Sequence, residues 1–159
     1  MSMIKELLSA EICGKCRVCC GFTHDDLWEI PLIFEENRKA VEERLGVKLS
    51  ERGKEFVFDM NFEGEVISYC PALTEDGCIL DELKPFDCAV WPFRVNTLGN
   101  KRVITVSPVC ETVYSLPLKR LSEFVIKDGL AQKLFAEAER HPDMVKPYID
   151  GYPILAVDN

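Results

Sequence analysis

Apolar residues recur with a helical period on both sides of the middle of the chain. Near the N-terminus the spacing predicts a short helix over residues 3–12, with an apolar face made of Ile4, Leu7, Leu8 and Ile12. Pro117 opens a second amphipathic stretch, which Gly129 divides in two and which His141 and Pro142 close. Its apolar positions are Leu118, Leu121, Phe124, Val125, Leu130, Leu134, Phe135 and Ala138.

A third helical pattern begins after Thr23. Thr23 and Asp26 form a variant of a capping box, and Asp25 and Asp26 would lie in a first turn, where the helix dipole favours acidic side chains. Pro31 interrupts this helix or restarts it, and a charged stretch over residues 32–45 then reaches Gly46. The pattern predicts one bent helix or two short helices.

Two pairs of segments predict β-hairpins. Residues 55–60 and 65–70 are rich in β-branched and aromatic side chains and are separated by a turn-forming stretch. Residues 93–98 and 102–107 alternate in the same way around Gly99, Asn100 and Lys101. The segment between the hairpins is punctuated by proline and glycine and predicts mostly loop, and the tail after residue 141 predicts a surface strap. The expected fold class is α+β, with two short antiparallel hairpins and flanking helices.

The composition fits one ordinary globular domain. The chain has 159 residues, of which 47% are hydrophobic, and we expect a single domain over 1–159 with a helical extension over 111–159. The net charge of −8 argues against a nucleic-acid partner. The apolar runs, such as 28–34, are too short for a membrane span, and Lys5, Glu6 and Glu11 interrupt any secretory signal. We therefore expect a cytoplasmic protein.

Eight cysteines are the outstanding feature of the sequence. In a reducing compartment such a number indicates metal ligands or redox groups more often than disulfides. Four of them lie in the run CGKCRVCC, in which the spacing CxxC aims two sulfur atoms at one ion, as in zinc and iron–sulfur sites. The candidate metal ligands are Cys13, Cys16, Cys19, Cys20, Cys70, Cys78, Cys88 and Cys110. We therefore expect a single cysteine-cluster metal-binding domain, with its α+β fold organised around a cysteine-ligated metal.

Eight thiolates would divide into two sites of four. Cys20 decides the division, because the side chains of adjacent residues diverge and Cys20 would face a different centre from Cys19. We expect three of the first four cysteines and one distal cysteine in one site, with the remaining cysteines in the other. The spacing does not show which distal cysteine joins the three proximal ones. It is also compatible with either zinc or an iron–sulfur cluster as the cofactor.

The cysteine pattern resembles the CxxCxxCC cysteine-cluster family, whose name describes a zinc- or iron-chelating domain. The resemblance covers residues 13 to about 110 and rests on CGKCRVCC, on Asp26 after it, and on CPAL, GCIL and KPFDCAVWPF. The chain departs from the family at Leu80, where tyrosine is usual, and at Lys84 and Ala89, where arginines are usual. These changes leave the thiols intact but remove guanidinium groups that could bind an anion in bidentate fashion.

Three functions fit these features. The first is an iron–sulfur protein with an electron-transfer or accessory role to another enzyme, and the second is a structural zinc module that binds a protein partner. The third is part of a protein methyl-transfer system, because some longer relatives of the family are flagellin lysine N-methylases. Packed thiols without metal and a disulfide framework are the alternatives for the cysteines themselves. The positive charges of Lys15 and Arg17 would lower the pKa values of the nearby thiols and help metal loading.

Overall fold

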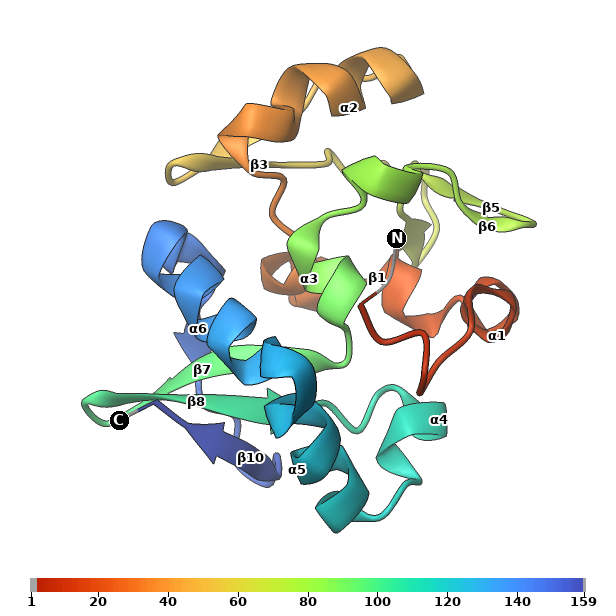
Figure 1. Ribbon diagram of the computed structural model, residues 1–159. Coiled ribbons are helices and arrows are strands. Elements are labelled where there is room, and N and C mark those ends of the chain that lie inside the picture. Colours follow the sequence, from red (N-terminus) through yellow and green to blue (C-terminus); the bar gives the residue numbers. More distant parts are fainter. Residues whose placement is uncertain (1–2, 159) are drawn as a thin grey trace. The chain divides into compact units, whose positions relative to one another are not determined.

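The computed structural model describes residues 3–158 and confirms the α+β class (Figure 1). The chain forms two compact units, unit 1 over Met1–Ala89 and unit 2 over Val90–Asn159. The described residues contain six α-helices, with short sheets in unit 1 and one four-stranded sheet in unit 2. The single domain with an extension over 111–159 stays a prediction.

Unit 1 consists of short elements joined by turns. Its helices are α1 (Ala10–Cys16), α2 (Arg38–Leu45) and α3 (Phe86–Val90), together with the 3₁₀ helices η1 (Val18–Cys20), η2 (His24–Glu29), η3 (Glu35–Asn37) and η4 (Asp81–Leu83). Its strands are β1 (Gly21–Phe22), β2 (Ser50–Arg52), β3 (Glu55–Val57), β4 (Ser68–Tyr69), β5 (Leu73–Thr74) and β6 (Gly77–Cys78). They pair as β1 with β4, β2 with β3, and β5 with β6.

The first helix lies further along the chain than its apolar spacing predicts. The side chain of Ser9 accepts a hydrogen bond from the N–H of Ile12, and this N-cap starts α1 at residue 10. Ile4 and Leu8 are buried in the turn that precedes it. Since α1 continues to Cys16 and η1 follows, the run that carries the first four cysteines is mostly helical. Arg17, in the left-handed conformation with φ of 58°, separates the two helices.

The predicted hairpin over 55–60 and 65–70 is wrong. Strand β3 pairs instead with β2, across a two-residue turn in which Gly53 has a φ of 62°. Strand β4 pairs with β1, about fifty residues earlier in the chain. Local composition identified both strands but not their partners, because a two-residue strand carries no periodic signal of its pairing.

The core of unit 1 lies between β3, α2 and the segment that carries two cysteines. Its fully buried members are Ile33, Val41, Phe56, Phe58, Ala72 and Leu80. Cys70 and Cys78 are partly buried and pack against this core. The hydrophobic packing of unit 1 therefore places two of the candidate ligands beside apolar side chains.

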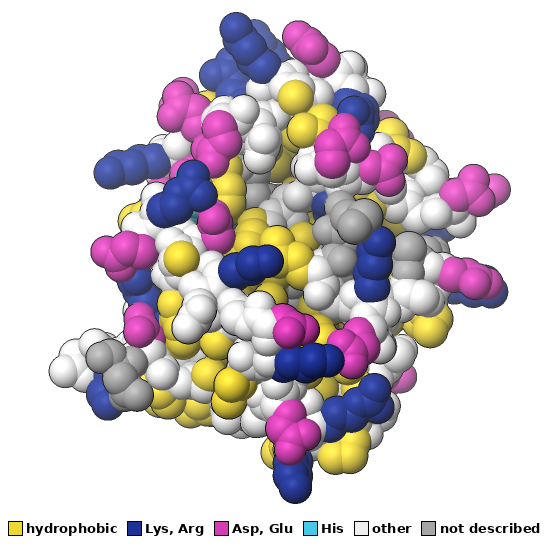
Figure 2. All heavy atoms as spheres, in the orientation of Figure 1, with side chains coloured by type: hydrophobic (Ala, Val, Ile, Leu, Met, Phe, Trp, Pro, Cys, Tyr) yellow, Lys and Arg dark blue, Asp and Glu magenta, His cyan; other side chains and the backbone are white. Residues whose placement is uncertain are grey.

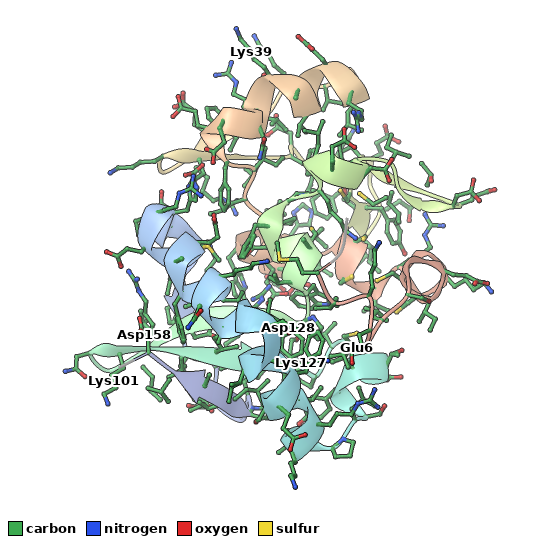
Figure 3. All side chains as sticks on the ribbon, in the orientation of Figure 1. Glu6, Lys39, Lys101, Lys127, Asp128 and Asp158 are labelled. Carbon is green, nitrogen blue, oxygen red and sulfur yellow. The ribbon has the colours of Figure 1, made fainter. Side chains whose placement is uncertain are left out.

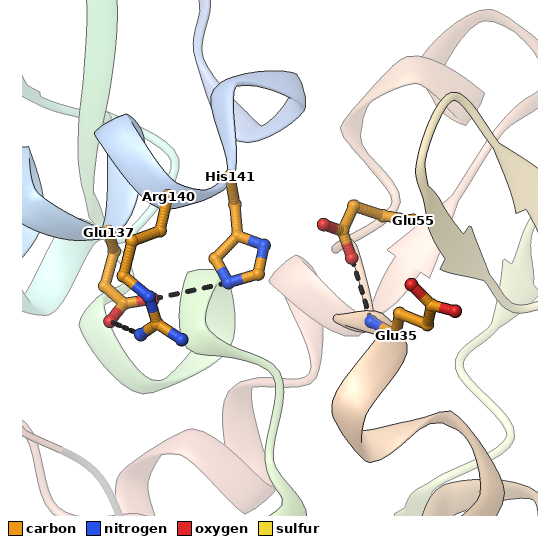
Figure 4. A network of polar contacts seen from close by, with 5 residues as sticks. All are labelled: Glu35, Glu55, Glu137, Arg140 and His141. Atoms are coloured by element: carbon orange, nitrogen blue, oxygen red, sulfur yellow. Dashed lines mark hydrogen bonds and ion pairs between the residues drawn. The ribbon is translucent and has the colours of Figure 1, made fainter.

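One buried carboxylate connects the two sides of this core (Figure 4). Glu55 is 6% exposed, and its Oε2 accepts a hydrogen bond of 2.9 Å from the backbone N–H of Glu35, in the first turn of η3. We expect Glu55→Ala to lower the free energy of unfolding by roughly 1 to 3 kcal/mol, because it leaves a backbone donor without its acceptor. Urea unfolding followed by circular dichroism measures this, with Glu51→Ala on an exposed position as the control. Equal unfolding midpoints for the two variants would contradict the prediction.

Unit 2 is a four-stranded sheet with helices on one face (Figure 1). The strands are β7 (Phe93–Leu98), β8 (Lys101–Val106), β9 (Lys146–Pro147) and β10 (Ile154–Val157), in the order β10-β8-β7-β9. The other elements are α4 (Glu111–Tyr114), α5 (Leu118–Ile126), η5 (Lys127–Gly129), α6 (Leu130–Arg140) and η6 (Pro142–Met144). Helix α5 lies against β10, and α6 lies against β7 and β8.

Several predictions for unit 2 are confirmed. Strands β7 and β8 form the expected hairpin, with Gly99 and Asn100 alone in the turn. Gly129, in the left-handed conformation, separates α5 from α6 as expected. The surface strap is wrong, because the tail adds β9 in parallel to β7 and β10 in antiparallel to β8. Over residues 3–158, no helix has both the length and the apolar character that crossing a membrane requires.

Candidate functional site

Backbone pairing brings the two cysteine-rich parts of unit 1 together. Gly21 in β1 lies opposite Tyr69 in β4, and the N–H of Cys70 donates a 2.8 Å hydrogen bond to the carbonyl oxygen of Cys20. Cys78 lies opposite Leu73 in the β5–β6 pair, and α1 lies against β6. Residues fifty or more positions apart in the chain thus meet around Cys20.

Six of the eight thiols interact electrostatically within unit 1. A negative charge on Cys20 raises the pKa values of Cys19, Cys70, Cys78 and Cys88. Cys70 acts in the same way on Cys88, and Cys78 acts on Cys70. Cys13 joins the group through its effect on Cys19. We call these six residues the thiol cluster: Cys13, Cys19, Cys20, Cys70, Cys78 and Cys88.

Loss of contact with water keeps most of the cluster protonated. Burial is the largest cause that raises the pKa of Cys70, to about 12 from an ordinary value of 9.0. The same cause raises the pKa of Cys78 and raises that of Cys88 further. A buried thiolate without a counter-charge is unfavourable, so the thiols hold their protons in the absence of such a charge.

Cys20 is the exception within the cluster. The thiol of Cys19 donates a hydrogen bond to the sulfur of Cys20, and this bond lowers the pKa of Cys20 to about 7 while it raises that of Cys19. The positive charges of Lys84 and Arg17 lower the pKa of Cys20 further. Above about pH 7 the pair therefore carries one negative charge, which resides on Cys20.

Sequence reasoning anticipated one of these cations but not the other. Arg17 acts on a nearby thiol as expected, and its guanidinium also lies 5.3 Å from the centre of the Tyr69 ring. Lys84 lowers the pKa values of Cys20, Cys78 and Cys88, although the sequence drew attention to it only as the loss of an arginine. The sequence could have indicated this role, because Lys84 stands only four residues before Cys88.

The adjacent cysteines do not diverge as expected. The hydrogen bond between their side chains shows that Cys19 and Cys20 turn toward each other. Cys20 nevertheless interacts with Cys70, Cys78 and Cys88, which are three of the four distal cysteines. The division of eight thiols into two sites of four stays a prediction.

The two remaining cysteines belong to α1 and to unit 2. Cys16 ends α1 and its side chain is exposed. Cys110 belongs to unit 2, where it is the N-cap residue of α4 and its carbonyl oxygen accepts a 2.9 Å hydrogen bond from the N–H of Tyr114. None of the eight cysteines forms a disulfide within the described residues.

The donor chemistry of the cluster suits a thiophilic metal, but the thiols are not arranged as ligands. Zinc and iron–sulfur clusters are held by cysteine sulfur, and the cluster offers sulfur donors in number. Among residues 3–158, however, no three side chains of His, Cys, Asp or Glu converge in a way that could hold a metal ion. The pKa shifts are instead those of buried thiols that keep their protons, with a hydrogen bond from Cys19 to Cys20.

The two histidines and Asp26 take part in local packing and polar contacts. His24 stacks on Phe62 with ring centres 3.9 Å apart, and Asp26 accepts a 2.8 Å hydrogen bond from the hydroxyl of Thr23. In unit 2, His141 follows α6, is buried, and lies 3.8 Å from a carboxylate oxygen of Glu137 (Figure 4). These contacts give each of the three polar side chains a role in packing or at the end of a helix.

The surface shown in Figure 2 carries charges of both signs. On the face drawn, Lys and Arg side chains lie among Asp and Glu side chains rather than in a patch of their own. Searches with the whole chain found no matching family model, no similar curated protein and no similar solved structure. The resemblance to the CxxCxxCC family therefore stays a prediction from the cysteine pattern, and so does the function that it implies.

Proposed function

We propose that this protein binds a metal centre, either zinc or an iron–sulfur cluster, through thiolates of unit 1. The observation that carries the proposal is the electrostatic coupling of six thiols around Cys20. Sulfur atoms from three separate stretches of chain are close enough to influence one another's ionisation. A cluster of this kind suits a metal site better than a hydrophobic core. Its buried thiols can become thiolates only if a cation accompanies them.

The proposed ligands are the four thiols that influence one another most completely. Cys20 acts on Cys70, Cys78 and Cys88, Cys78 acts on Cys70, and Cys70 acts on Cys88. These four sulfur atoms would complete a tetrahedral site with the ligands Cys20, Cys70, Cys78 and Cys88. Metal binding would displace their protons, because a thiol must lose its proton to become a ligand.

The nearby cations fit the charge of such a centre. Four thiolates with Zn²⁺, or with an oxidised four-iron cluster of the same charge, leave a net charge of about −2. Lys84 and Arg17 supply two positive charges that already stabilise the thiolate of Cys20. An iron–sulfur centre would give the protein an electron-transfer or accessory role to another enzyme, whereas zinc would make the site a structural module for protein binding.

The test is metal analysis of protein purified without oxygen. Iron, zinc and acid-labile sulfide are measured per chain in the wild type and in Cys20→Ser, Cys88→Ser and Cys16→Ser. We expect stoichiometric metal in the wild type and loss of most of it in Cys20→Ser and Cys88→Ser. Iron with equal sulfide identifies a cluster, and zinc without sulfide identifies the structural alternative.

Cys16→Ser is the matched control, because Cys16 is an exposed cysteine of the same sequence motif and does not belong to the thiol cluster. The variant should retain the metal held by the four proposed ligands, and loss of a further metal would reveal a second site with Cys16 as a ligand. Circular dichroism of each variant separates loss of metal from loss of fold. Wild-type protein that carries no stoichiometric metal and takes up none on reconstitution would overturn the proposal.

A further inference from the structure

The sheet of unit 2 has two different edges. Strand β9 forms one edge, has two residues, and ends in Pro147, which has no N–H to offer a partner. Strand β10 forms the other edge, with the sequence Ile-Leu-Ala-Val and neither charge nor proline within it. Charges and prolines are among the features that protect a sheet edge, and β10 has neither between Ile154 and Val157.

The hydrogen bonds of β10 define which of its groups face outward. The N–H of Val106 donates to the carbonyl oxygen of Pro153 at 3.3 Å, and the N–H of Asp158 donates to that of Arg102 at 2.9 Å. In an antiparallel pair, alternate residues direct both backbone groups away from the neighbouring strand. Ile154 and Val157, next to these bonded positions, therefore present their N–H and C=O groups to the open edge.

A β-bulge in β10 allows two residues with an odd spacing to face the same open edge of the sheet. The register with β8 shifts between Ile154 and Ala156, so Ile154 and Val157 both face outward although they are three residues apart. Their side chains are 42% and 43% exposed, whereas Leu155 is buried at 7%. Among residues 3–158, the structure records no hydrogen bond for Ile154 or Val157 other than those of the sheet.

We propose that β10 pairs antiparallel with β10 of a second copy of this chain. With the two-fold axis between Leu155 and Ala156, Ile154 lies opposite Val157 of the second copy, and Val157 lies opposite Ile154 of the second copy. Each of these pairs would exchange both N–H···O=C bonds, and the exposed apolar side chains would pack across the interface. The strand is thus complementary to itself, as a two-fold interface requires.

Neighbouring surfaces favour a second copy as the occupant. Helix α5 lies against β10 and leaves Leu118 and Ile126 exposed at 52% and 65%. A two-fold axis normal to the sheet would bring α5 of both copies onto the same face, where these side chains add apolar area to the strand contact. The charges of Lys101 and Asp158 lie at the hairpin end of the sheet, beyond the four residues that would pair (Figure 3).

The experiment measures the mass of the full chain in solution over a range of concentrations, by light scattering after size exclusion. We expect wild-type protein to reach twice the monomer mass of 18.1 kDa. Val157→Pro removes an outward N–H that β8 does not use, and Ile154→Lys brings a charge to the paired position. Each should weaken dimerisation by at least about tenfold, while circular dichroism stays that of the wild type.

Val66→Lys is the control, because Val66 is a more exposed apolar residue, at 75%, in unit 1. This variant should dimerise like the wild type. A wild type that stays monomeric at every concentration would overturn the inference, and so would a dimer whose stability neither Val157→Pro nor Ile154→Lys changes. If a variant fails to fold, hydrogen exchange of the wild type decides: protection of the Val157 amide must increase with protein concentration.

Discussion

Raising the pH of the metal-free protein from about 9 to about 11 should destabilise unit 1 by several kcal/mol. The reason is that buried thiols keep protons which the unfolded chain releases. Burial raises the pKa of Cys70 to about 12 and raises that of Cys88 as well, whereas both thiols ionise near 9.0 once they are exposed. Above pH 9 the folded state therefore binds more protons than the unfolded state, and the free energy of unfolding decreases as the pH rises.

The slope follows from the number of thiols involved. Each thiol that stays protonated only in the folded state contributes about 1.4 kcal/mol per pH unit, so Cys19, Cys70 and Cys88 together contribute about 4 kcal/mol per unit. Cys20 acts in the opposite direction, because its pKa is lowered to about 7. The stability contributed by Cys20 is present above pH 9 and is lost as the pH falls from about 9 through about 7.

Urea unfolding at a series of pH values measures this slope. Cys88→Ala should make the alkaline decrease shallower by about 1.4 kcal/mol per pH unit, whereas Cys16→Ser, at an exposed position, should leave it unchanged. Protein loaded with the proposed metal should lose the alkaline decrease, because its ligand thiols are already deprotonated at neutral pH. A slope that is the same with and without Cys88 would show that burial of this thiol does not control alkaline stability.

The sequence was most informative where a local signal determines the structure. Gly99 and Asn100 between alternating segments predicted the β7–β8 hairpin, and Gly129 predicted the break between α5 and α6. Pairing between distant segments was not predictable in this way. Strand β4 has two residues and finds its partner near Cys20 through tertiary packing, which no periodicity within residues 65–70 reveals.

The candidate site shows the same limit. The number and spacing of the cysteines predicted that thiols from remote segments gather, and six of them interact. Their individual roles depend on contacts that spacing does not encode. Cys19 shares a proton with Cys20 because a turn of η1 brings their sulfur atoms together, and Lys84 acts on three thiols because the chain before α3 passes beside them.

The second large effect is expected at Asn96, which is completely buried in β7. Its side-chain amide donates to the carbonyl oxygens of Lys146 and Pro147, at 3.3 and 3.2 Å, and its Oδ1 accepts a 2.6 Å hydrogen bond from Thr105. Because Pro147 has no N–H, the short parallel strand β9 depends on this amide for part of its attachment. Asn96 thereby connects β8, β7 and β9.

Asn96→Ala should lower the free energy of unfolding by about 3 kcal/mol, since it leaves the buried hydroxyl of Thr105 without its acceptor and creates a cavity. Thr97→Ala, at the exposed next position, should cost far less. Thr105→Val removes the hydroxyl instead. The double variant with Asn96→Ala should lose less free energy of unfolding than the sum of the two single variants, because both substitutions remove the same hydrogen bond. Additive losses in urea unfolding would mean that Asn96 stabilises unit 2 independently of Thr105, so that only its bonds to β9 matter.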